Sequence, residues 1–539
     1  MKRYVNEEFI KKGKVEDREY QRNLVKSIVE NRSTLVVAPT ALGKTIVAAL
    51  AIAERLKEEP DGKTVFLAPT KPLTEQHRKT LEEVMDLDSN KFTTLTGKIK
   101  PKERYKKWKE KQIITATPQT TRNDILKEKM PLEEVSLIIF DEAHRAVKEY
   151  AYVLVSDEYK MRRKEDKLVL ALTASPGSKK SKIERVCKNL GIDNIEIKTE
   201  EDSDVEPYVQ EKDFNWIKVD FPEDLKKIKK ELQGYMAKLY SELREDGFIN
   251  SYDVDRTRKK ELLNLRRRLI QMDNKGHKTY KALSNVAGLM KVHHAIELIE
   301  TQGVTPTLKY LEKIRGKKGK DKTKAGERMI KDPKIQKAIV NLHEMREKNK
   351  EHPKMSKTIE EIKGKIKDGK KILLFTQYRD TVQELVERLI EEEIEVQRFI
   401  GQTNKKNTDG MSQERQKETL EEFREKEAAV LVATQIAEEG LDIPSVDSVI
   451  FYEPIPSEIR HIQRKGRAGR RQKGEVTIMI TKNTRDQAYY WVSKNREKKM
   501  KRMLKKWRDE KRNPKSKHDP KINKSQKTLN QYTGKGKSE

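Results

Sequence analysis

The stretch "LIIFDEAHRA", residues 137–146, joins an apolar run to two adjacent acidic residues. Leu137 to Phe140 have the composition of a buried strand, and Asp141 and Glu142 follow them directly. A buried strand gains nothing from two carboxylates at its end unless a ligand outside needs them. Open α/β sheets bind their ligands beyond the carboxyl ends of the strands. The stretch therefore predicts a parallel sheet with an acidic ligand site at that edge.

Apolar runs of the same kind recur through the first half of the chain and again near its end. The early runs are "STLVVAPT", "TVFLAPT", "QIITATPQT" and "KLVLALTASP", and the late runs are "KILLFTQY", "AAVLVATQ", "VDSVIFYEP" and "EVTIMIT". Short Val- and Ile-rich runs separated by segments of helical length are typical of βα units and a parallel sheet. The sequence therefore predicts two α/β domains.

The segment between these two sets of runs has helical periodicity, with Leu225, Ile228 and Leu232 three or four residues apart. We therefore expect an all-helical insert at 206–355, between α/β domains at 1–205 and 356–493. From residue 494 the chain carries 18 Lys or Arg against 5 Asp or Glu. Because it also has few apolar residues, we expect 494–539 to be a disordered basic tail.

The whole chain of 539 residues has a formal net charge of +30, and 38% of its residues are charged. This charge favours a polyanionic partner, most simply nucleic acid, although a Lys/Glu-rich solvated surface is the alternative. No stretch approaches the ~20 apolar residues that span a bilayer, and the amino terminus lacks a signal-peptide core. We therefore expect a soluble, cytoplasmic protein. The single cysteine, Cys187, excludes a disulfide framework and a cysteine zinc cluster.

The stretch "APTALGKT", residues 38–45, follows an expected strand and opens an expected helix, as a phosphate-binding loop does. In such a loop Lys44 reaches the β- and γ-phosphates of a nucleotide, and the Thr45 hydroxyl ligates Mg²⁺. The acidic pair then has a use, because Asp141 suits a Mg²⁺-holding acid and Glu142 suits the group that orients or deprotonates the attacking water. ATP and Mg²⁺ are the expected cofactors.

A cluster of arginines in the second α/β domain complements this site. The stretch "HIQRKGRAGR", residues 461–470, places Arg467 and Arg470 three apart on one face of an expected helix. Such arginines reach a γ-phosphate held on a neighbouring domain and stabilise the charge of the transition state. A solvated or nucleic-acid-binding face is the alternative, which their position beside the second sheet disfavours.

Taken in order, these motifs resemble those of the superfamily 2 helicases of the DEAH-box type. The matching stretches are "REYQ", "APTALGKT", "LAPTKPLTEQ", "LTGK", "TATPQT", "DEAH", "TASPG", "LLFTQYRD", "ATQIAEEGLDIPSVDSVIFYEP" and "QRKGRAGR". The resemblance implies two RecA-like parallel-sheet domains that bind ATP in the cleft between them. It also implies an ATP hydrolase that moves along nucleic acid.

Three further stretches, "DVEPYV", "FYEPIPSEIRHIQRKGRAGR" and "AIELIETQGV", are similar to the archaeal Hef helicases and the related Fanconi-anaemia M translocases. This resemblance implies a thumb-like helical insert that grips branched DNA, and a 3′-to-5′ helicase or translocase of forks and junctions in DNA repair. Two features depart from the family. Ala41 replaces a loop glycine, which costs about 1 kcal/mol if that residue needs a positive φ. No "ERK" motif of an XPF-type nuclease is present, so nuclease activity is not expected.

The resemblance also implies roles for individual residues. Those expected at the nucleotide are Gln21, which reads adenine, and Thr40, Gly43, Lys44, Thr45, Gly440 and Asp442. Those expected to couple hydrolysis to movement are His144, Thr173, Ser175 and Gln463. Those expected to contact DNA are Thr70, Thr96, Gly97, Thr117, Gln377, Thr403 and Thr434, together with Arg266, Arg267 and Arg268 of the insert.

Near the end of the chain, "QKTLNQYTG" places Gln526, Leu529 and Tyr532 close to one helical face. This resembles the peptide by which DNA-processing enzymes dock on the sliding clamp (PCNA), with Thr533 in place of the second aromatic residue. Residues 526–533 are therefore a candidate clamp-binding motif.

Two other functions fit the same motif set. A duplex-RNA-stimulated translocase of the Dicer or RIG-I-like type shares the motifs and also carries a helical insert. A non-catalytic junction-binding scaffold would carry a vestigial ATP site, and the intact Lys44, Asp141 and Glu142 argue against it.

Overall fold

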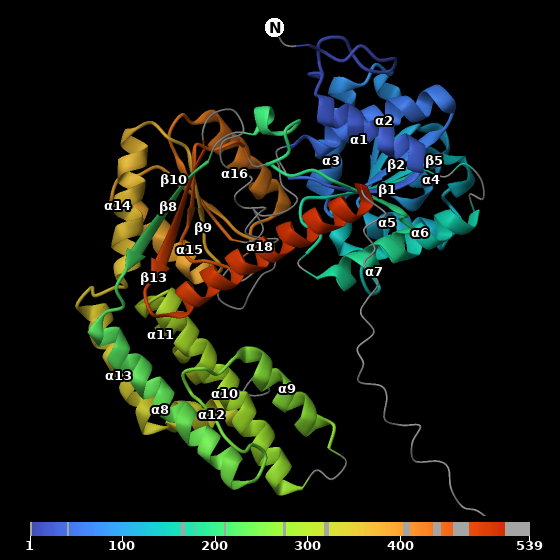
Figure 1. Ribbon diagram of the computed structural model, residues 1–539. Coiled ribbons are helices and arrows are strands. Elements are labelled where there is room, and N and C mark those ends of the chain that lie inside the picture. Colours follow the sequence, from blue (N-terminus) through green and yellow to red (C-terminus); the bar gives the residue numbers. More distant parts are fainter. Residues whose placement is uncertain are drawn as a thin grey trace, which may run out of the picture.

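The structure is a computed structural model of the chain. It describes residues 3–39, 42–162, 166, 168–177, 179–209, 212–272, 276–316, 323–402, 410–434, 444–455 and 474–512. Two α/β domains lie next to each other, and a helical insert extends away from the second one (Figure 1). One long helix, α18 (Arg485–Arg512), crosses from the second domain to the first (Figure 1).

The first domain is built on a seven-stranded, all-parallel sheet in the order β3-β4-β2-β5-β6-β1-β7. The strands are β1 (Ser33–Val37), β2 (Lys63–Leu67), β3 (Phe92–Leu95), β4 (Ile113–Ala116), β5 (Val135–Phe140), β6 (Leu168–Thr173) and β7 (Asn194–Ile197). The main helices are α1 (Glu19–Asn31), α2 (Lys44–Glu58), α3 (Lys71–Val84), α4 (Pro101–Glu110), α5 (Pro118–Ile125), α6 (Ala151–Arg162) and α7 (Lys180–Leu190).

Helices cover both faces of this sheet, so its central strands are buried and mainly apolar. On β5, Leu137 and Ile139 join the core beneath α1 and α2, whereas Ile138 and Phe140 join the core beneath α6 and α7. The strand ends at Phe140 because its polar successors have no room on either face. The predicted parallel sheet, with the acidic pair at its carboxyl edge, is confirmed.

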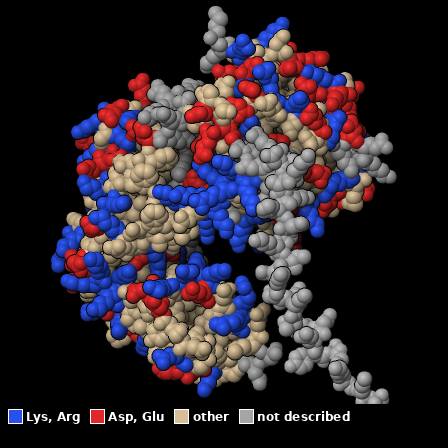
Figure 2. Space-filling view, viewed as in Figure 1, with Lys and Arg blue, Asp and Glu red and all other residues tan. Residues whose placement is uncertain are grey.

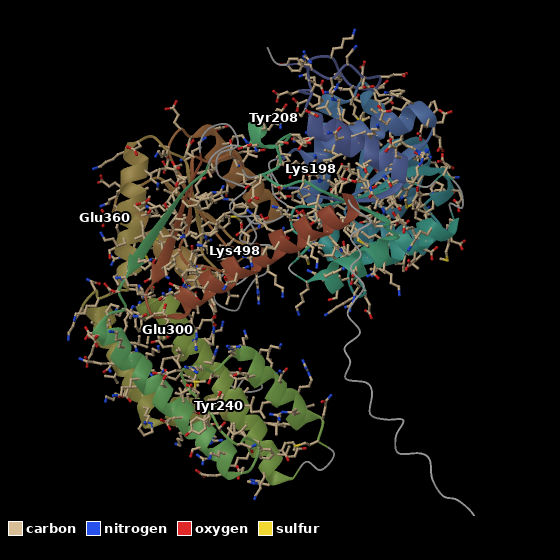
Figure 3. All side chains as sticks on the ribbon, viewed as in Figure 1. Lys198, Tyr208, Tyr240, Glu300, Glu360 and Lys498 are labelled. Carbon is tan, nitrogen blue, oxygen red and sulfur yellow. The ribbon has the colours of Figure 1, made fainter. Side chains whose placement is uncertain are left out.

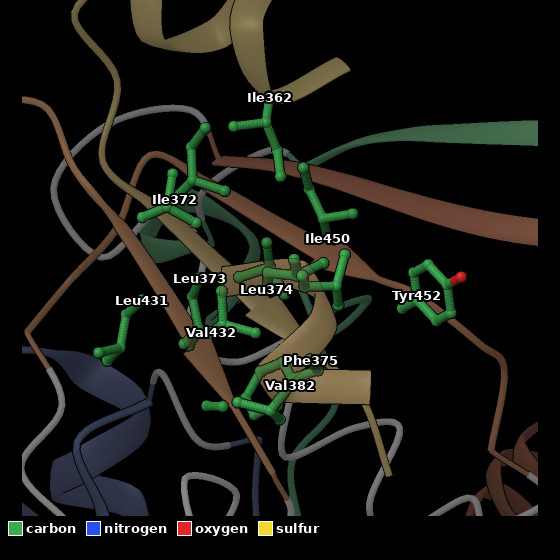
Figure 4. Close-up of a cluster of buried hydrophobic side chains, with 14 of the residues drawn as sticks. Ile362, Ile372, Leu373, Leu374, Phe375, Val382, Leu431, Val432, Ile450 and Tyr452 are labelled. Carbon is green, nitrogen blue, oxygen red and sulfur yellow. The ribbon is translucent and has the colours of Figure 1, made fainter. Parts of the chain in front are cut away.

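The second domain has a six-stranded, parallel sheet in the order β10-β11-β9-β12-β13-β8. Its strands are β8 (Lys212–Val219), β9 (Ile372–Phe375), β10 (Val396–Phe399), β11 (Val430–Ala433), β12 (Ser448–Phe451) and β13 (Gly474–Thr481), and its helices include α14 (Pro353–Lys367), α15 (Arg379–Glu391) and α16 (Gln413–Glu425). Figure 4 shows the buried aliphatic and aromatic side chains that join strands and helices in its core.

The edge strand β8 differs from the sequence expectation. Residues 206–355 are predicted above to be all-helical, but β8 pairs with β13 over eight residues and so belongs to the second sheet. Phe214 and Trp216 of β8 are exposed, and the strand therefore lacks the continuous buried run by which the other strands are recognised. The helical part of the insert begins after this strand.

Among its described residues, the insert proper contains helices and connecting loops but no strand. Its helices are α8 (Glu223–Glu245), α9 (Lys259–Ile270), α10 (His277–Thr301), α11 (Val304–Arg315), α12 (Lys324–Lys331) and α13 (Pro333–Glu347). They share one apolar core, centred on α8 and α10. In the part of the chain that the structure describes, no helix is long and apolar enough to cross a membrane.

Helix α18 corrects the expectation of a disordered tail beginning at residue 494. The helix continues to Arg512, and Met500 and Leu504 are buried in the core of the first domain beneath α7. Met503 and Trp507 pack against the same core. These four residues stand at i, i+3, i+4 and i+7 and form a short apolar stripe on one face of the helix. The many lysines around them give the segment the overall composition of a disordered tail.

A buried ion pair fixes the start of α18 in the second domain. Lys354 Nζ, on α14, lies 2.6 Å from Asp486 Oδ2, and both side chains are 0% exposed. Asp486 also accepts from the Thr481 hydroxyl (3.0 Å), and Lys354 Nζ lies 4.8 Å from the centroid of the Tyr452 ring. Burial of a charge costs free energy, and the attraction between Lys354 and Asp486 offsets that cost for both. Removing either side chain would leave the other charge buried without its partner.

The same end of α18 also holds the insert. Arg485 donates to the His293 carbonyl (3.0 Å), and the Tyr489 hydroxyl donates to Glu297 Oε1 (2.8 Å). Glu300, labelled in Figure 3, also lies at this junction. Its carboxylate lies 2.7 Å from Lys229 Nζ. The second domain, the insert and α18 therefore meet in one polar, buried junction.

We expect Lys354→Met to lower the free energy of unfolding by about 3–5 kcal/mol, because it leaves the Asp486 carboxylate buried without its partner. Urea denaturation measures the change. The control is Lys357→Met on the same helix, which breaks the exposed Lys357–Glu360 pair and should cost less than about 1 kcal/mol. Equal effects of the two substitutions would contradict the role assigned to the buried pair.

Candidate functional site: a nucleotide site linked to the long helix

The phosphate loop ends at Gly43, which has a φ of +64° and caps α2. A side chain there would be strained, and its Cβ would lie 3.2 Å from Gln21 Nε2. Two α1 residues brace the loop: the Tyr20 hydroxyl donates to the Leu42 carbonyl (3.0 Å), and Gln21 Nε2 lies 3.4 Å from the same oxygen. The predicted adenine-reading glutamine thus lies against the loop itself.

Lys44 is folded back over the loop. Its Nζ donates to the carbonyls of Ala38 (3.2 Å) and Pro39 (3.3 Å). Burial lowers the pKa of Lys44, and the negative charges of Glu142 and Asp141 oppose that shift. The three groups predicted to act on the nucleotide therefore share one site at the carboxyl edge of the sheet.

His77, on α3, connects the two expected Mg²⁺ ligands. Its Nε2 lies 3.0 Å from Asp141 Oδ2, and its Nδ1 lies 3.3 Å from the Thr45 hydroxyl oxygen. Its ring stacks on Phe66, with centroids 4.3 Å apart. Burial raises the pKa of Asp141, but the hydrogen bond from His77 and the charges of His77 and Lys44 outweigh burial and hold that pKa below its ordinary value.

No sequence pattern singles out His77 as a site residue. It is a single histidine on an amphipathic helix, a pattern more typical of a core side chain than of a site. Only the packing of α3 against β2 and β5 brings its two ring nitrogens between Thr45 and Asp141.

Glu142 has an unusual backbone and an unsatisfied carboxylate. Its φ and ψ are +48° and +47°, in the left-handed region that non-glycine residues seldom adopt. Its Oε2 is buried and has no hydrogen-bond partner among the described residues, although His144 Nδ1 lies 3.2 Å away. Strained backbone and unpaired buried acids are concentrated at functional sites. The geometry therefore supports a chemical use for this carboxylate.

A series of polar contacts leads away from Glu142. His144 Nδ1 lies 3.2 Å from Thr173 Oγ1, and the Ser175 N–H donates to the same Thr173 oxygen (3.3 Å). The Ser175 hydroxyl in turn donates to the sulfur of Met500 (3.3 Å) on α18. The structure thus brings together the three described residues that were predicted to couple hydrolysis to movement.

Within the two α/β domains, the described residues predicted to contact DNA lie where strands of the sheets end. Thr70 follows β2 and caps α3, Thr96 and Gly97 follow β3, and Thr117 follows β4. In the second domain, Gln377 follows β9 and Thr434 follows β11. Gly97 is exposed, Thr70, Thr117 and Gln377 are half-buried, and Thr96 and Thr434 are buried.

The arginines of the insert lie apart from these loops. Arg266, Arg267 and Arg268 are exposed on α9. Arg266 lines a pocket between α9, α10 and α11 together with Lys259 and Lys291. His293 and His294 do not belong to any group of His, Cys, Asp and Glu side chains that could hold a metal among the described residues.

Several predicted residues lie outside the described part of the chain. They are Thr40, Ala41, Thr403, Gly440, Asp442, Gln463, Arg467, Arg470, Gln526, Leu529 and Tyr532.

Three family models match the chain in sequence order. "DEAD/DEAH box helicase" covers residues 18–183, "Putative ATP-dependent RNA helicase, helical bundle" covers 224–349, and "Helicase conserved C-terminal domain" covers 353–472. These matches correspond to the first domain, the insert and the second domain.

Individual proteins are similar over nearly the whole chain. The crystal structure of the Pyrococcus furiosus Hef helicase domain has 42% identity and a TM-score of 0.67, over 88% of this chain and 98% of that one. "Putative ATP-dependent RNA helicase MJ1505" of Methanocaldococcus jannaschii is 40% identical over 93% of this chain, and "ATP-dependent DNA helicase mph1" of Neurospora crassa is 32% identical over 88%. The chain spans 62% and 41% of the lengths of these two relatives. It therefore belongs to the ATP-dependent superfamily 2 DEAD/DEAH-box helicases, in the branch that contains Hef, Mph1 and the Fanconi anaemia group M proteins.

Proposed function

We propose that this helicase uses ATP to move in the 3′-to-5′ direction on branched DNA, such as forks and junctions, during DNA repair. The observation that carries the proposal is the Glu142 carboxylate, whose Oε2 is buried, which lies beside Lys44 and Asp141 and connects through His144 and Thr173 to Ser175. A site that only stored nucleotide would need neither this acid on a strained backbone nor its link to a distant loop.

The residues present fit the hydrolysis of a Mg²⁺-bound nucleotide. Hydroxyl and carboxylate oxygens, which Thr45 and Asp141 supply on either side of His77, are the ligands that Mg²⁺ prefers. When bound, Mg²⁺ supplies positive charge at the phosphates. Lys44 would exchange its two loop carbonyls for phosphate oxygens, and Glu142 would orient the attacking water or accept its proton. Arg467 and Arg470 would act from the second domain.

The choice of DNA rests on the Hef and Mph1 relatives and on the insert. Contacts from strand-end loops to the phosphate backbone would let the motor move over any sequence. The exposed arginines of α9 would bind a second arm of a fork, so the insert would supply the preference for branched substrates.

Duplex RNA is the second candidate substrate, because both the family model that matches the insert and the Methanocaldococcus jannaschii relative carry RNA helicase in their names. Contacts to phosphates alone do not distinguish the two sugars. The test is the rate of ATP hydrolysis with forked DNA, plain duplex DNA and duplex RNA, each at the same nucleotide concentration. Greatest stimulation by the fork supports the proposal, and stimulation by duplex RNA without stimulation by the fork would overturn it in favour of the RNA-directed motor.

Glu142→Gln should keep the binding of ATP and DNA but lower the fork-stimulated turnover of ATP by about 10²–10⁴-fold, because the carboxylate acts on water rather than on the bound nucleotide. Steady-state hydrolysis and equilibrium binding of a fluorescent ATP analogue measure the two effects separately. Lys44→Ala is the comparison and should weaken nucleotide binding as well. Near wild-type turnover in Glu142→Gln would show that the acid has another role.

His77→Ala should raise the Mg²⁺ concentration needed for half-maximal binding of a fluorescent nucleotide by about ten-fold or more, because His77 orients both expected ligands. Turnover at saturating Mg²⁺ should change much less. His343→Ala, at an exposed histidine of the insert, is the matched control. An unchanged Mg²⁺ dependence would mean that His77 only fills the space between α3 and the sheet.

We further propose that residues 526–533 bind the sliding clamp. Leu529 and Tyr532 would fill an apolar pocket of the clamp, and the basic segment before them would act as a tether that raises the local concentration. A peptide spanning 520–539 should bind the clamp with micromolar affinity, on the order of −8 kcal/mol, by calorimetric titration. The peptide with Leu529→Ala and Tyr532→Ala should not bind, and equal titrations of both peptides would refute the motif.

A further inference from the structure

Helix α18 has two opposite faces of different chemistry between residues 496 and 507. At 100° per residue, Met500, Met503, Leu504 and Trp507 fall on the face that packs into the first domain. Lys498, Lys501, Arg502 and Lys505 fall on the opposite face, and all four are exposed. Lys499 and Lys506, at the border between the faces, are exposed as well, and so is Arg496, which lies one turn before Met500 on the apolar side.

Acidic residues are few along this stretch of the helix. Glu497 is the one acidic residue between 487 and 507. Outside the helix, Glu201 Oε1 lies 4.0 Å from Lys501 Nζ, at the limit of an ion pair. So many positive charges on 11 residues of helix, about 16 Å in length, repel one another and gain free energy when a polyanion neutralises them.

The basic face borders the opening between the insert and the first domain. In Figure 2, Lys and Arg cover the surface over α18, and more of them lie along the rim of the insert across the opening. Lys259, Arg266 and Lys291 of α9 and α10 line a pocket on that side. Figure 3 labels Lys498 on the stretch of α18 between the two sheets. The opening therefore has basic side chains on both sides.

The apolar face of α18 touches the loop that follows the nucleotide site. Met500 accepts the hydrogen bond of the Ser175 hydroxyl (3.3 Å), and Leu504 is buried in the same core. Lys180 Nζ, at the start of α7, lies 5.4 Å from the Trp507 ring. A shift of α18 must therefore change the surroundings of Ser175, which is two contacts away from His144.

We propose that α18 is a nucleic-acid-sensing strut: its basic face binds the phosphate backbone in the opening, and its apolar face transmits that binding to the Ser175 loop. The inference rests on the proposed function, since it assumes that the chain binds nucleic acid. It adds a contact surface outside the strand-end loops and a route by which binding reaches the ATP site.

The first test is the salt dependence of binding. Each lysine that contacts a phosphate contributes about 0.9 to the slope of log affinity against log salt concentration. The variant Lys498→Gln, Lys501→Gln, Lys505→Gln should therefore bind a fluorescent forked DNA with a slope smaller by about two to three. Duplex RNA, titrated separately, shows whether the strut distinguishes the two backbones.

The matched control is Lys357→Gln, Lys363→Gln, Lys367→Gln on α14, which removes the same charge from the outer side of the second sheet (Figure 1). The salt slope of this control should stay within about 0.5 of the wild-type slope. Salt screens charges that lie far from the bound DNA, so the α14 lysines should contribute little to binding. Equal losses of slope in the two variants would show that only net charge matters and would overturn the proposal. Circular dichroism establishes that α18 remains helical in the test variant.

The second test separates transmission from binding. Met500→Ala with Leu504→Ala leaves the basic face intact but removes the contact with Ser175. The DNA concentration for half-maximal stimulation of ATP hydrolysis should stay within about two-fold, whereas maximal stimulation should fall several-fold. Retained stimulation would overturn the transmission step, and retained salt slope in the lysine variant would overturn the binding step. A wild-type protein that binds neither forked DNA nor duplex RNA would instead refute the proposed function itself.

Discussion

The two-sided burial of β5 is the constraint on which the site depends. A parallel strand covered by helices on both faces has little room for charged side chains along its length, because buried charges without partners cost free energy. The one polar side chain within β5, Ser136, donates to the Lys63 carbonyl. Asp141 and Glu142 therefore follow Phe140, at the carboxyl edge of the sheet. The phosphate loop, which follows β1, lies at the same edge. The same rule places the loops after β2, β3 and β4 at this edge, so one packing requirement gathers nucleotide groups and strand-end loops.

Sequence alone predicts most of this arrangement, because buried strands and phosphate loops have strong local patterns. Lys44, Thr45, Asp141 and Glu142 meet as expected, and the helical insert lies between the two sheets. The pattern fails where tertiary contacts decide the structure. The exposed strand β8 lacks an apolar run, and the apolar stripe of α18 is shorter than the basic sequence around it. His77 shows the same limit, since only three-dimensional packing reveals that its two nitrogens join Thr45 to Asp141.

The two ends of α18 are held by different kinds of interaction. At its start, the contacts are directional. Asp486 pairs with Lys354 of the second domain, and Arg485 and Tyr489 form hydrogen bonds with the insert. Toward its other end, Met500 and Leu504 make apolar contacts with the first domain. The polar contacts there include the weak hydrogen bond to the Met500 sulfur, the Lys180–Trp507 contact and the 4.0 Å Lys501–Glu201 pair. Directional buried contacts permit few alternative arrangements, whereas apolar contacts with a flexible methionine permit several of similar free energy.

This asymmetry determines where relative movement costs least. If the two domains change their separation during ATP hydrolysis, breaking the Lys354–Asp486 pair would expose two buried charges to an unfavourable environment. Sliding Met500 and Leu504 over the surface of α7 would cost only a rearrangement of apolar contacts. The second domain, the insert and α18 should therefore move as one body, and the first domain should move against it. Because Ser175 touches α18 at that sliding contact, the polar series that begins at Glu142 ends where the displacement is greatest. The contact between Ser175 and Met500 thus links the ATP site to the place where the domains move against each other. Strong directional bonds at this place would have hindered that movement.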